Sequence, residues 1–226
     1  MRKWEELPKY MQNESVRYCY DILVDKQKSL KMKRLFDVIV SFVLIIALLP
    51  VLLIISIMVK TDSKGPVFYK QIRITAYGRK FKIFKFRTMV DHADQLGAQV
   101  TTKGDARITK VGMMLRKVRL DELPQLFNVF LGDMTFVGTR PEVPKYVRYY
   151  TDEMKATLLL PAGITSRTSI EYKDEEKLLE NAEDADEVYI HQVMPAKMKY
   201  NLQEIEKFSF FRDICTMVQT VIAVLR

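Results

Sequence analysis

The feature that most constrains the fold is an uncharged apolar segment, residues 38–59, with the sequence VIVSFVLIIALLPVLLIISIMV. Its length of about 22 residues suffices for a membrane span, which needs about 20. Pro50 lies near its middle, where a proline removes a backbone donor and clashes with the preceding turn of a helix. The sequence therefore predicts an apolar helix that is broken at Pro50.

Basic residues flank both ends of this segment. The positive-inside tendency places such residues on the cytoplasmic face, so it favours both ends on one side. A re-entrant helix satisfies that demand; the alternative is a single-pass helix kinked at Pro50, which lipid tolerates where neighbours satisfy the freed backbone groups. The residues alone leave both topologies open. The flanking cations are Lys26, Lys28, Lys31, Lys33 and Arg34 on one side, and Lys60, Lys64, Lys70, Arg73, Arg79 and Lys80 on the other.

Composition narrows the class of protein. The 226 residues are 48% hydrophobic and carry a net charge of +8, which fits one globular domain plus a membrane element. The scattered cations lack a recognised nucleic-acid module, so we expect no nucleic-acid partner and favour an anionic membrane or a phosphorylated substrate. Cys19 and Cys215 indicate a reducing cytoplasm rather than a disulfide scaffold. His92 and His191 are isolated, which argues against a histidine metal site.

Three regions are expected along the chain. Residues 1–32 form a helical extension, which lies near the membrane interface or packs as a solvated helix on the body. Residues 33–60 form the broken membrane helix, and residues 61–226 form a cytoplasmic domain that ends in an amphipathic helix. We expect no signal peptide, because about 32 mostly polar residues precede the apolar run and no small-residue cleavage site follows it.

The cytoplasmic domain shows both helical and strand periodicity. Alternating apolar and basic residues around Tyr77-Gly78 predict a β-hairpin with one basic face. The fold is therefore expected to be α+β, mostly helical with a short hairpin. The other expectations are a loop at 91–106, helix at 108–131 interrupted at 121–124, helix at 142–160, an acidic solvated face at 171–187, and a core or interfacial helix at 208–226.

The densest group of charged residues runs from Arg116 to Gln125. Asp121 and Glu122 follow several cations, and Pro124 suits the first turn of a helix. One interpretation makes Asp121 an N-cap, with Glu122 favoured by the helix dipole. In the other, the amides of the helix N-terminus join Arg116 and Arg119 in binding a phosphate.

The second interpretation gives Asp121 a chemical role. Nearby cations would keep its carboxylate ionised, and an ionised aspartate facing a phosphate can attack phosphorus to form an acyl-phosphate. That attack needs the phosphate charge to be neutralised. Mg²⁺ suits this task because it uses few carboxylates and several waters, and Glu122 is the nearest candidate ligand.

Two further groups could contribute to an anion site. Residues 132–142 contain glycines that permit tight turns, and Arg140 offers a planar fork for phosphate or for a base edge. Lys85 and Arg87 share one face of the predicted strand and could line the same anionic pocket. A structural turn and a solvated strand face are the simpler alternatives.

The ordered motifs resemble bacterial sugar transferases, the monotopic phosphoglycosyl transferases. The resemblance covers roughly residues 33–225 and leaves residues 1–32 outside. The motifs that carry it are Lys33-Arg34-Leu35-Phe36-Asp37, Gly65-Pro66-Val67-Phe68, Gln71-Ile72-Arg73, Gly78, Lys85-Phe86-Arg87-Thr88-Met89, Leu120-Asp121-Glu122-Leu123-Pro124-Gln125-Leu126-Phe127-Asn128-Val129, Gly132-Asp133-Met134 to Arg140-Pro141, and Pro161-Ala162-Gly163-Ile164-Thr165.

The resemblance implies a reaction and a set of roles. A sugar-1-phosphate moves from a UDP-sugar to polyprenyl phosphate, releasing UMP. Asp121 would be the covalent nucleophile, Glu122 would help hold Mg²⁺, and Arg116 would belong to the active-site cluster. The segment that carries Arg140 and Pro141 would contact the nucleotide. A re-entrant helix broken at a proline, matching Pro50, is also implied.

The resemblance has limits. Thr139 and Ala162 replace residues that are usual in the family, and residues 166–172 diverge where the sugar is expected to be chosen, so the sugar stays open. The expected partners are a UDP-sugar, polyprenyl phosphate, membrane lipid and a second copy in a homodimer. The expected location is the cytoplasmic face of the bacterial inner membrane. The alternative function is a non-catalytic membrane-anchored scaffold that binds anionic lipid or a partner enzyme.

Overall fold

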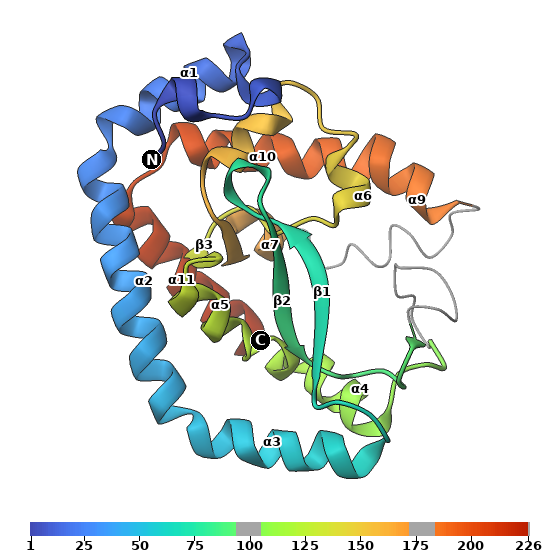
Figure 1. Cartoon of the computed structure of the whole chain (residues 1–226). Coiled ribbons are helices and arrows are strands. Elements are labelled where there is room, and N and C mark those ends of the chain that lie inside the picture. The colour runs from blue at the N-terminus through green and yellow to red at the C-terminus, as the bar shows by residue number, and fades with distance from the viewer. Residues whose placement is uncertain (94–104, 172–183, 226) are drawn as a thin grey trace.

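Two long helices form an angular frame around the rest of the molecule (Figure 1). The structure is a computed structural model that describes residues 1–93, 105–171 and 184–225. Helices α2 (Gln27–Ala47) and α3 (Leu49–Asp62) make the two sides of the frame. The other elements pack within the angle that these two helices form (Figure 1).

The remaining elements are helices and short strands, which confirms the predicted α+β class, mostly helical with a hairpin. The other helices are α1 (Glu14–Asp25), α4 (Lys110–Lys117), α5 (Gln125–Leu131), α6 (Pro144–Val147), α7 (Arg167–Glu171), α9 (Ala185–Val188), α10 (Met194–Glu206) and α11 (Phe210–Leu225). The strands are β1 (Phe68–Ile74), β2 (Lys80–Phe86), β3 (Met134–Val137) and β4 (Ala162–Thr165). Short 3₁₀ segments are η1 (Trp4–Glu6), η2 (Lys9–Met11), η3 (Ala76–Gly78), η5 (Leu120–Glu122) and η6 (Met154–Leu159), and η7 (Tyr189–Val193) is a π-helical turn.

The break between α2 and α3 falls at the predicted proline. Pro50 lies in the first turn of α3, where its missing N–H removes no helical hydrogen bond. The two axes meet at a bend of 62°. Within the described residues, no single helix is both long and apolar enough to cross a membrane, whereas α2 and α3 together reach that length and composition. Helix α2 begins at Gln27, before the expected boundary at residue 33.

A buried polar cluster fixes α2 to the domain, and we call it the anchor joint: Lys33, Asp37, Thr135 and Asp213. Lys33 Nζ donates to the carbonyl of Val137 at 2.9 Å and forms an ion pair with Asp213. The hydroxyl of Thr135 donates to Asp37 Oδ2 at 2.6 Å. Because these residues come from α2, β3 and α11, the joint sets where the apolar frame meets the domain.

The predicted hairpin is present, with its turn at Tyr77-Gly78. Strands β1 and β2 pair antiparallel from Phe68 opposite Phe86 to Ile74 opposite Lys80. Tyr77 and Gly78 both adopt left-handed backbone angles, with φ of 59° and 72°. Because side chains alternate along a strand, Lys80 and Lys82 project from one face of β2 and Lys85 from the other. The basic face and the face that carries Lys85 are therefore opposite.

A second, parallel pair of strands passes through the domain. Met134 of β3 lies opposite Ala162 of β4. A Cβ atom on Gly163 would lie only 2.2 Å from the backbone nitrogen of Gly138, so the two chain segments touch backbone to backbone. The expected helix at 142–160 is wrong: α6 and η6 are separate short segments. Pro144 begins α6 after the extended residue Val143, so no helix runs through residues 142 and 143, and α6 ends after a single turn at Val147.

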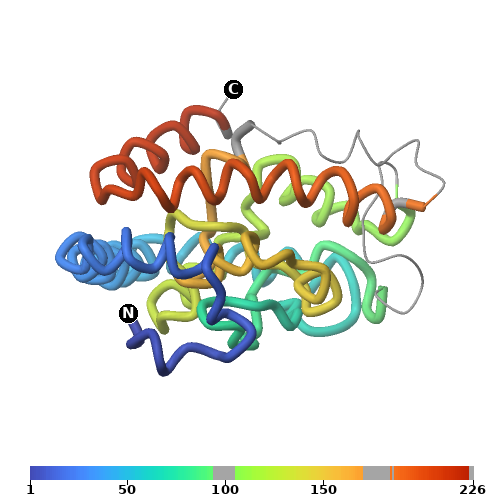
Figure 2. The backbone as a smooth tube through the Cα atoms, turned by 90° about the horizontal axis from the view of Figure 1, so that it is seen from above, coloured from blue at the N-terminus to red at the C-terminus, as the bar shows by residue number. Residues whose placement is uncertain are grey.

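The two ends of the chain pack on opposite sides of the domain (Figure 2). Met11, Val16 and Leu23 of the N-terminal extension are fully buried in a core that also contains η6 and α10, so the extension packs on the body. Helix α11 buries Thr216 but leaves Phe211 74% exposed. Most of the predicted loop at 91–106 and of the acidic stretch at 171–187 lies outside the described residues.

Candidate active site

The paired carboxylates lie in a tight turn between α4 and α5. Arg119, just before the turn, has a left-handed φ of 54°, which is uncommon for a residue with a side chain. Its amide donates to the carbonyl of Arg116 at 3.2 Å. This conformation turns the chain sharply after α4 and directs it into η5, which holds Asp121 and Glu122.

Of the two interpretations of Asp121, the structure does not support the N-cap of α5. Pro124 occupies the N-cap of α5, and Asp121 lies inside η5. The amide of Glu122 donates to the carbonyl of Arg119 at 3.2 Å, and the amide of Leu123 donates to that of Leu120 at 3.3 Å. These amides are used within the turn and precede α5; a phosphate site at the N-terminus of α5 stays a prediction.

Glu122 accepts hydrogen bonds from two cations on one oxygen. Lys85 Nζ lies 2.8 Å and an Arg140 guanidinium nitrogen 2.7 Å from Glu122 Oε1. Lys85 comes from β2 and Arg140 follows β3, so three distant segments meet here. Burial alone would raise the pKa of Glu122, but the charges of Arg140 and Lys85 hold it well below its usual range. Glu122 is therefore ionised at neutral pH.

Asp121 differs from its neighbour. Its side chain is buried, with the residue only 8% exposed, and burial raises its pKa although Lys85 and Arg116 act to lower it. The effect of burial on the pKa of Asp121 is larger than the opposing effect of the nearby cations, contrary to the expectation from the sequence. Asp121 forms no ion pair with any described residue. We call Lys85, Asp121, Glu122 and Arg140 the charged cluster.

The other predicted binding residues lie at different distances from this cluster. Arg116 is half-buried and acts electrostatically on Asp121, whereas Arg119 is exposed. Pro141 is buried, and its carbonyl accepts a hydrogen bond from Arg73 at 3.0 Å. Sequence reasoning gave Arg73 no role at the site. The guanidinium fixes the segment that carries Arg140, and burial lowers its pKa.

Arg87 does not share a pocket with Lys85. Its guanidinium donates to backbone carbonyls at the end of α3, including that of Ser63 at 2.7 Å and that of Lys64. Gly65 makes room for this contact, because a Cβ there would lie 2.1 Å from Arg87. A cation that caps the C-terminus of a helix satisfies carbonyls left without helical donors. Arg87 therefore holds the end of the apolar frame against β2.

Gln125 is a residue at the site to which the sequence assigned no role. It follows Pro124, is almost completely buried, and its Nε2 atom has no hydrogen-bond partner in the described part of the chain. Unsatisfied buried amides are rare and costly. The only sequence signal was its place four residues after Asp121.

The charged cluster fits Mg²⁺ only together with a substrate. Among the residues that the structure describes, no three His, Cys, Asp or Glu side chains gather to hold a metal ion. Mg²⁺ is commonly bound by one or two carboxylates plus substrate phosphates, and the ionised Glu122 beside Asp121 supplies that minimum. These two carboxylates are thus compatible with a Mg²⁺ ion that binds together with the diphosphate of a substrate.

A small cavity lies beside Arg140. The centre of a water molecule can occupy only about 10 Å³ of it, so the cavity has room for about one water. Ser166 and Thr168 reach it from the end of β4 and the start of α7, and Lys197 and Asn201 reach it from α10. The divergent residues 166–169 therefore adjoin the charged cluster through Arg140.

Comparison with known proteins agrees with these features. A sequence model of the family described as bacterial sugar transferase matches residues 28–226. A UDP-N-acetylgalactosamine-undecaprenyl-phosphate N-acetylgalactosaminephosphotransferase of Aeromonas hydrophila is 33% identical over 196 residues, which is 85% of this chain and 43% of that protein. A UDP-glucose:undecaprenyl-phosphate glucose-1-phosphate transferase of Klebsiella pneumoniae is 36% identical over 193 residues, 84% of this chain and 39% of that protein.

The chain thus spans about two fifths of the length of these two relatives, at 43% and 39%. A relative of similar size is the uncharacterized sugar transferase EpsL of Bacillus subtilis, 32% identical over 194 residues, 86% of this chain and 87% of that protein. The family match covers most of the chain, from α2 through the charged cluster to α11. The chain therefore belongs to the bacterial sugar transferase family.

Proposed function

We propose that the protein transfers a sugar-1-phosphate from a UDP-sugar to polyprenyl phosphate (undecaprenyl phosphate in the named relatives) and releases UMP. The observation that carries the proposal is the charged cluster. A buried aspartate that forms no ion pair within the described part of the chain lies beside a glutamate that holds two cations, Lys85 and Arg140. The names of the relatives support the substrates.

The first step is an attack by Asp121. A carboxylate oxygen forms a bond to the β-phosphorus of the UDP-sugar, and the bond from that phosphorus to the oxygen shared with UMP breaks. UMP leaves with the bonding electron pair, and the sugar phosphate remains on Asp121 as an acyl-phosphate. Lys85 and Arg140 donate to Glu122 in the free protein and are placed to turn to the donor's diphosphate.

The second step returns the carboxylate. A phosphate oxygen of the polyprenyl acceptor attacks the same phosphorus, and the acyl-phosphate bond breaks toward Asp121. The product is polyprenyl-diphosphate-sugar. The positive charge of Arg116 favours the ionised carboxylate of Asp121 in both steps. Mg²⁺, when bound through Glu122 and the diphosphate, would supply neutralisation of phosphate charge.

The reaction joins a water-soluble donor to a lipid, so we place the site at the cytoplasmic face of the bacterial inner membrane. The bent pair α2–α3 would enter and leave lipid by that face. Cysteines introduced at Lys28 and Lys64, both exposed, test the topology in a variant without Cys19 and Cys215. Labelling of both from the same side supports a re-entrant helix, and labelling from opposite sides would show a span.

The sugar is left open, and we expect it to be chosen in the divergent segment after β4, which begins at Ser166 beside Arg140. Hydroxyls of Ser166 and Thr168 and the amine of Lys197 offer donors and acceptors to a sugar ring. A screen of UDP-sugars, scored by UMP release, would identify the donor. A homodimer stays a prediction.

The decisive test is to trap the intermediate. The detergent-solubilised protein should release UMP from a UDP-sugar only with Mg²⁺, and mass spectrometry without acceptor should find a phosphosugar on Asp121. Asp121→Asn should abolish both signals. Asp133→Asn is the matched control, because Asp133 pairs with Arg79 outside the charged cluster at 2.7 Å. Turnover that needs a ternary complex and leaves no adduct would favour direct transfer.

The second candidate is a membrane-anchored scaffold without catalysis. The exposed apolar residues of α2 and α3 favour it, because they would bind lipid whether or not the charged cluster reacts. Vesicle binding that is unaffected by Asp121→Asn, with no UMP released from any donor, would support the scaffold over the enzyme.

A further inference from the structure

The C-terminal turn of α5 exposes two large apolar side chains. Leu131 is 65% exposed and Phe130 is 39% exposed. The Phe130 ring stacks on Phe42 of α2, with ring centroids 5.9 Å apart and planes at 29°. Phe42 lies in the middle of the apolar face of α2. Any depth that Phe42 reaches in lipid is therefore also reached by the end of α5.

This apolar surface is continuous with the outer face of the frame. A row of exposed apolar residues extends along α2 and α3 on either side of the break at Pro50. The row includes Leu35, Ile39, Phe42, Val43, Ile46, Leu49, Leu53, Ile54 and Ile57. The end of α5 widens this row beside Phe42 rather than forming a separate patch.

The backbone carbonyls at the C-terminus of α5 accept hydrogen bonds from other groups of the protein. Arg34 donates to the carbonyl of Val129 at 2.7 Å and to that of Phe130 at 2.9 Å. The amide of Gly132 donates to the carbonyl of Asn128 at 3.1 Å. In hydrocarbon every backbone polar group must be satisfied internally, because no water reaches it. Arg34 does this for the carbonyls that a helix usually leaves to water.

The polar boundary follows at once. Asp133 forms an ion pair with Arg79 at 2.7 Å, and the hydroxyl of Thr75 donates to its carbonyl at 2.6 Å. The chain therefore passes within a few residues from an apolar tip to a charged layer. Such a sequence of layers matches the change from acyl chains to headgroups in a bilayer.

We propose that Phe130 and Leu131 form a third lipid-contacting element, which inserts beside α2 and sets the height of the charged cluster above the acyl chains. The proposal rests on the membrane insertion of α2 and α3 proposed above. Asp121 and Leu131 are joined by one short helix and its preceding turn, a separation on the order of 15 Å. A tip in the acyl layer thus places Asp121 near the headgroups, where an acceptor phosphate lies.

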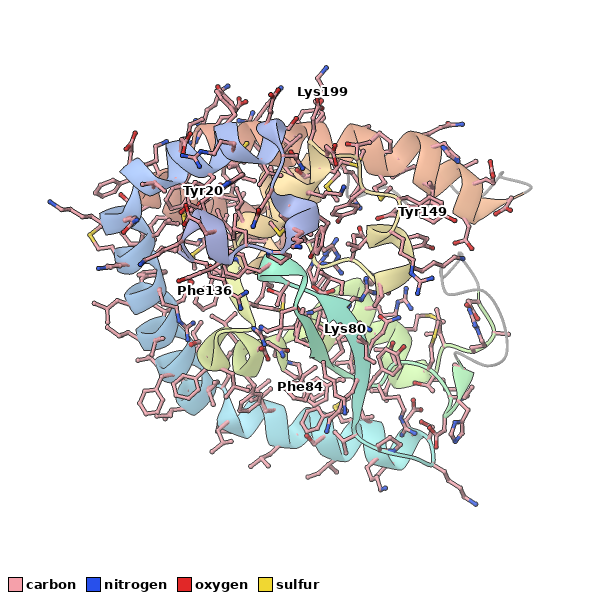
Figure 3. All side chains as sticks on the ribbon, turned by 45° about the horizontal axis from the view of Figure 1, so that its top comes forward. Tyr20, Lys80, Phe84, Phe136, Tyr149 and Lys199 are labelled. Atoms are coloured by element: carbon pink, nitrogen blue, oxygen red, sulfur yellow. The ribbon has the colours of Figure 1, made fainter. Side chains whose placement is uncertain are left out.

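Depth-dependent fluorescence quenching tests this placement. Trp4 is the single tryptophan of the chain, so Trp4→Phe gives a silent background. Tryptophan is then introduced by Leu131→Trp, by Phe42→Trp as the positive control, and by Tyr149→Trp as the negative control. Tyr149 is exposed and lies on the side of the molecule away from α2 (Figure 3). The probe is a phosphatidylcholine–phosphatidylglycerol vesicle with brominated acyl chains.

We expect Leu131→Trp to lose the same fraction of fluorescence as Phe42→Trp, with Tyr149→Trp unchanged. Quenching of Phe42→Trp without quenching of Leu131→Trp would overturn the inference and leave the membrane anchor standing. Absence of quenching at Phe42→Trp would overturn the anchor and the inference together.

A kinetic measurement tests the height. Leu131→Asp, at an exposed position, should raise the KM for polyprenyl phosphate in vesicles about tenfold, with little change for a short-chain acceptor in detergent. Leu131→Met should behave as the parent. An unchanged KM in vesicles for Leu131→Asp would refute the role in setting height.

Discussion

The charged cluster and the anchor joint both combine acids and cations at buried or half-buried positions, yet they are arranged differently. In the anchor joint, Lys33 donates to a carbonyl and to Asp213, and Asp37 accepts from Thr135, so the described polar groups satisfy one another. In the charged cluster, Glu122 takes both cations and Asp121 is left without an ion pair among the described residues. The first arrangement ties elements together; the second retains a carboxylate for chemistry.

The largest expected effect comes from a substitution in the charged cluster. Asp121→Asn removes the nucleophile and keeps the shape of the side chain, so we expect UMP release to fall by at least about 10⁴-fold. The fold should be retained, because Asp121 ties no two elements together. Circular dichroism and vesicle binding equal to those of the parent would show this. Activity within about tenfold of the parent would contradict the assignment of the nucleophile.

The anchor joint should give the opposite result. Lys33→Met leaves Asp213 buried without its cation, which we expect to lower the free energy of unfolding by about 3–5 kcal/mol. The folded fraction should retain most of its activity per molecule. Chemical unfolding in detergent measures the loss.

A double variant separates the ion pair from packing. Lys33→Met with Asp213→Leu replaces both charges by apolar groups, so it should recover most of the lost stability. If the single variant were as stable as the parent, the joint would not hold α2 as described.

The contrast between the two sets also explains which features the sequence revealed. Asp121 and Glu122 were found because adjacent acids beside cations form a local pattern, and Pro50 and the hairpin turn are likewise local. The contacts that define the clusters are not local: Lys85 and Glu122 are 37 residues apart, and Lys33 and Asp213 are 180 apart. Periodicity along a strand or helix carries no information about such pairs.

The same reason explains the errors. Lys85 and Arg87 share a strand face, yet α3 ends beside Arg87 and its carbonyls take that guanidinium. Asp121 followed the pattern of an N-cap, but the tight turn η5 shifts the helix start to Pro124. Arg73 and Gln125 were missed because their contribution depends only on what the fold places around them.

A smaller effect compares the two carboxylates of the charged cluster. The pKa of Glu122 is depressed in the folded protein, so its ionisation adds stability above the unfolded pKa of about 4.3, which is lost as the pH falls through the folded value. The pKa of Asp121 is raised, so its charge opposes folding above that pKa. With a chelator present at pH 7, Glu122→Gln should lower the free energy of unfolding, and Asp121→Asn should raise it by about 1 kcal/mol. If both variants changed the free energy of unfolding in the same direction, this would contradict the conclusion that Lys85 and Arg140 stabilise Glu122 rather than Asp121.

The smallest expected effect concerns Gln125, whose buried Nε2 atom has no partner among the described residues. Gln125→Met keeps the length of the side chain and removes an unsatisfied amide, so stability should stay unchanged or rise by about 1 kcal/mol. If the amide serves only packing, turnover stays at the parent level. If it is held for the donor or acceptor, turnover falls while stability does not, and the KM of the affected substrate identifies which. A loss of stability would instead show that the amide is satisfied in the folded protein, and Gln125 would then belong with the closed polar groups of the anchor joint rather than with the charged cluster.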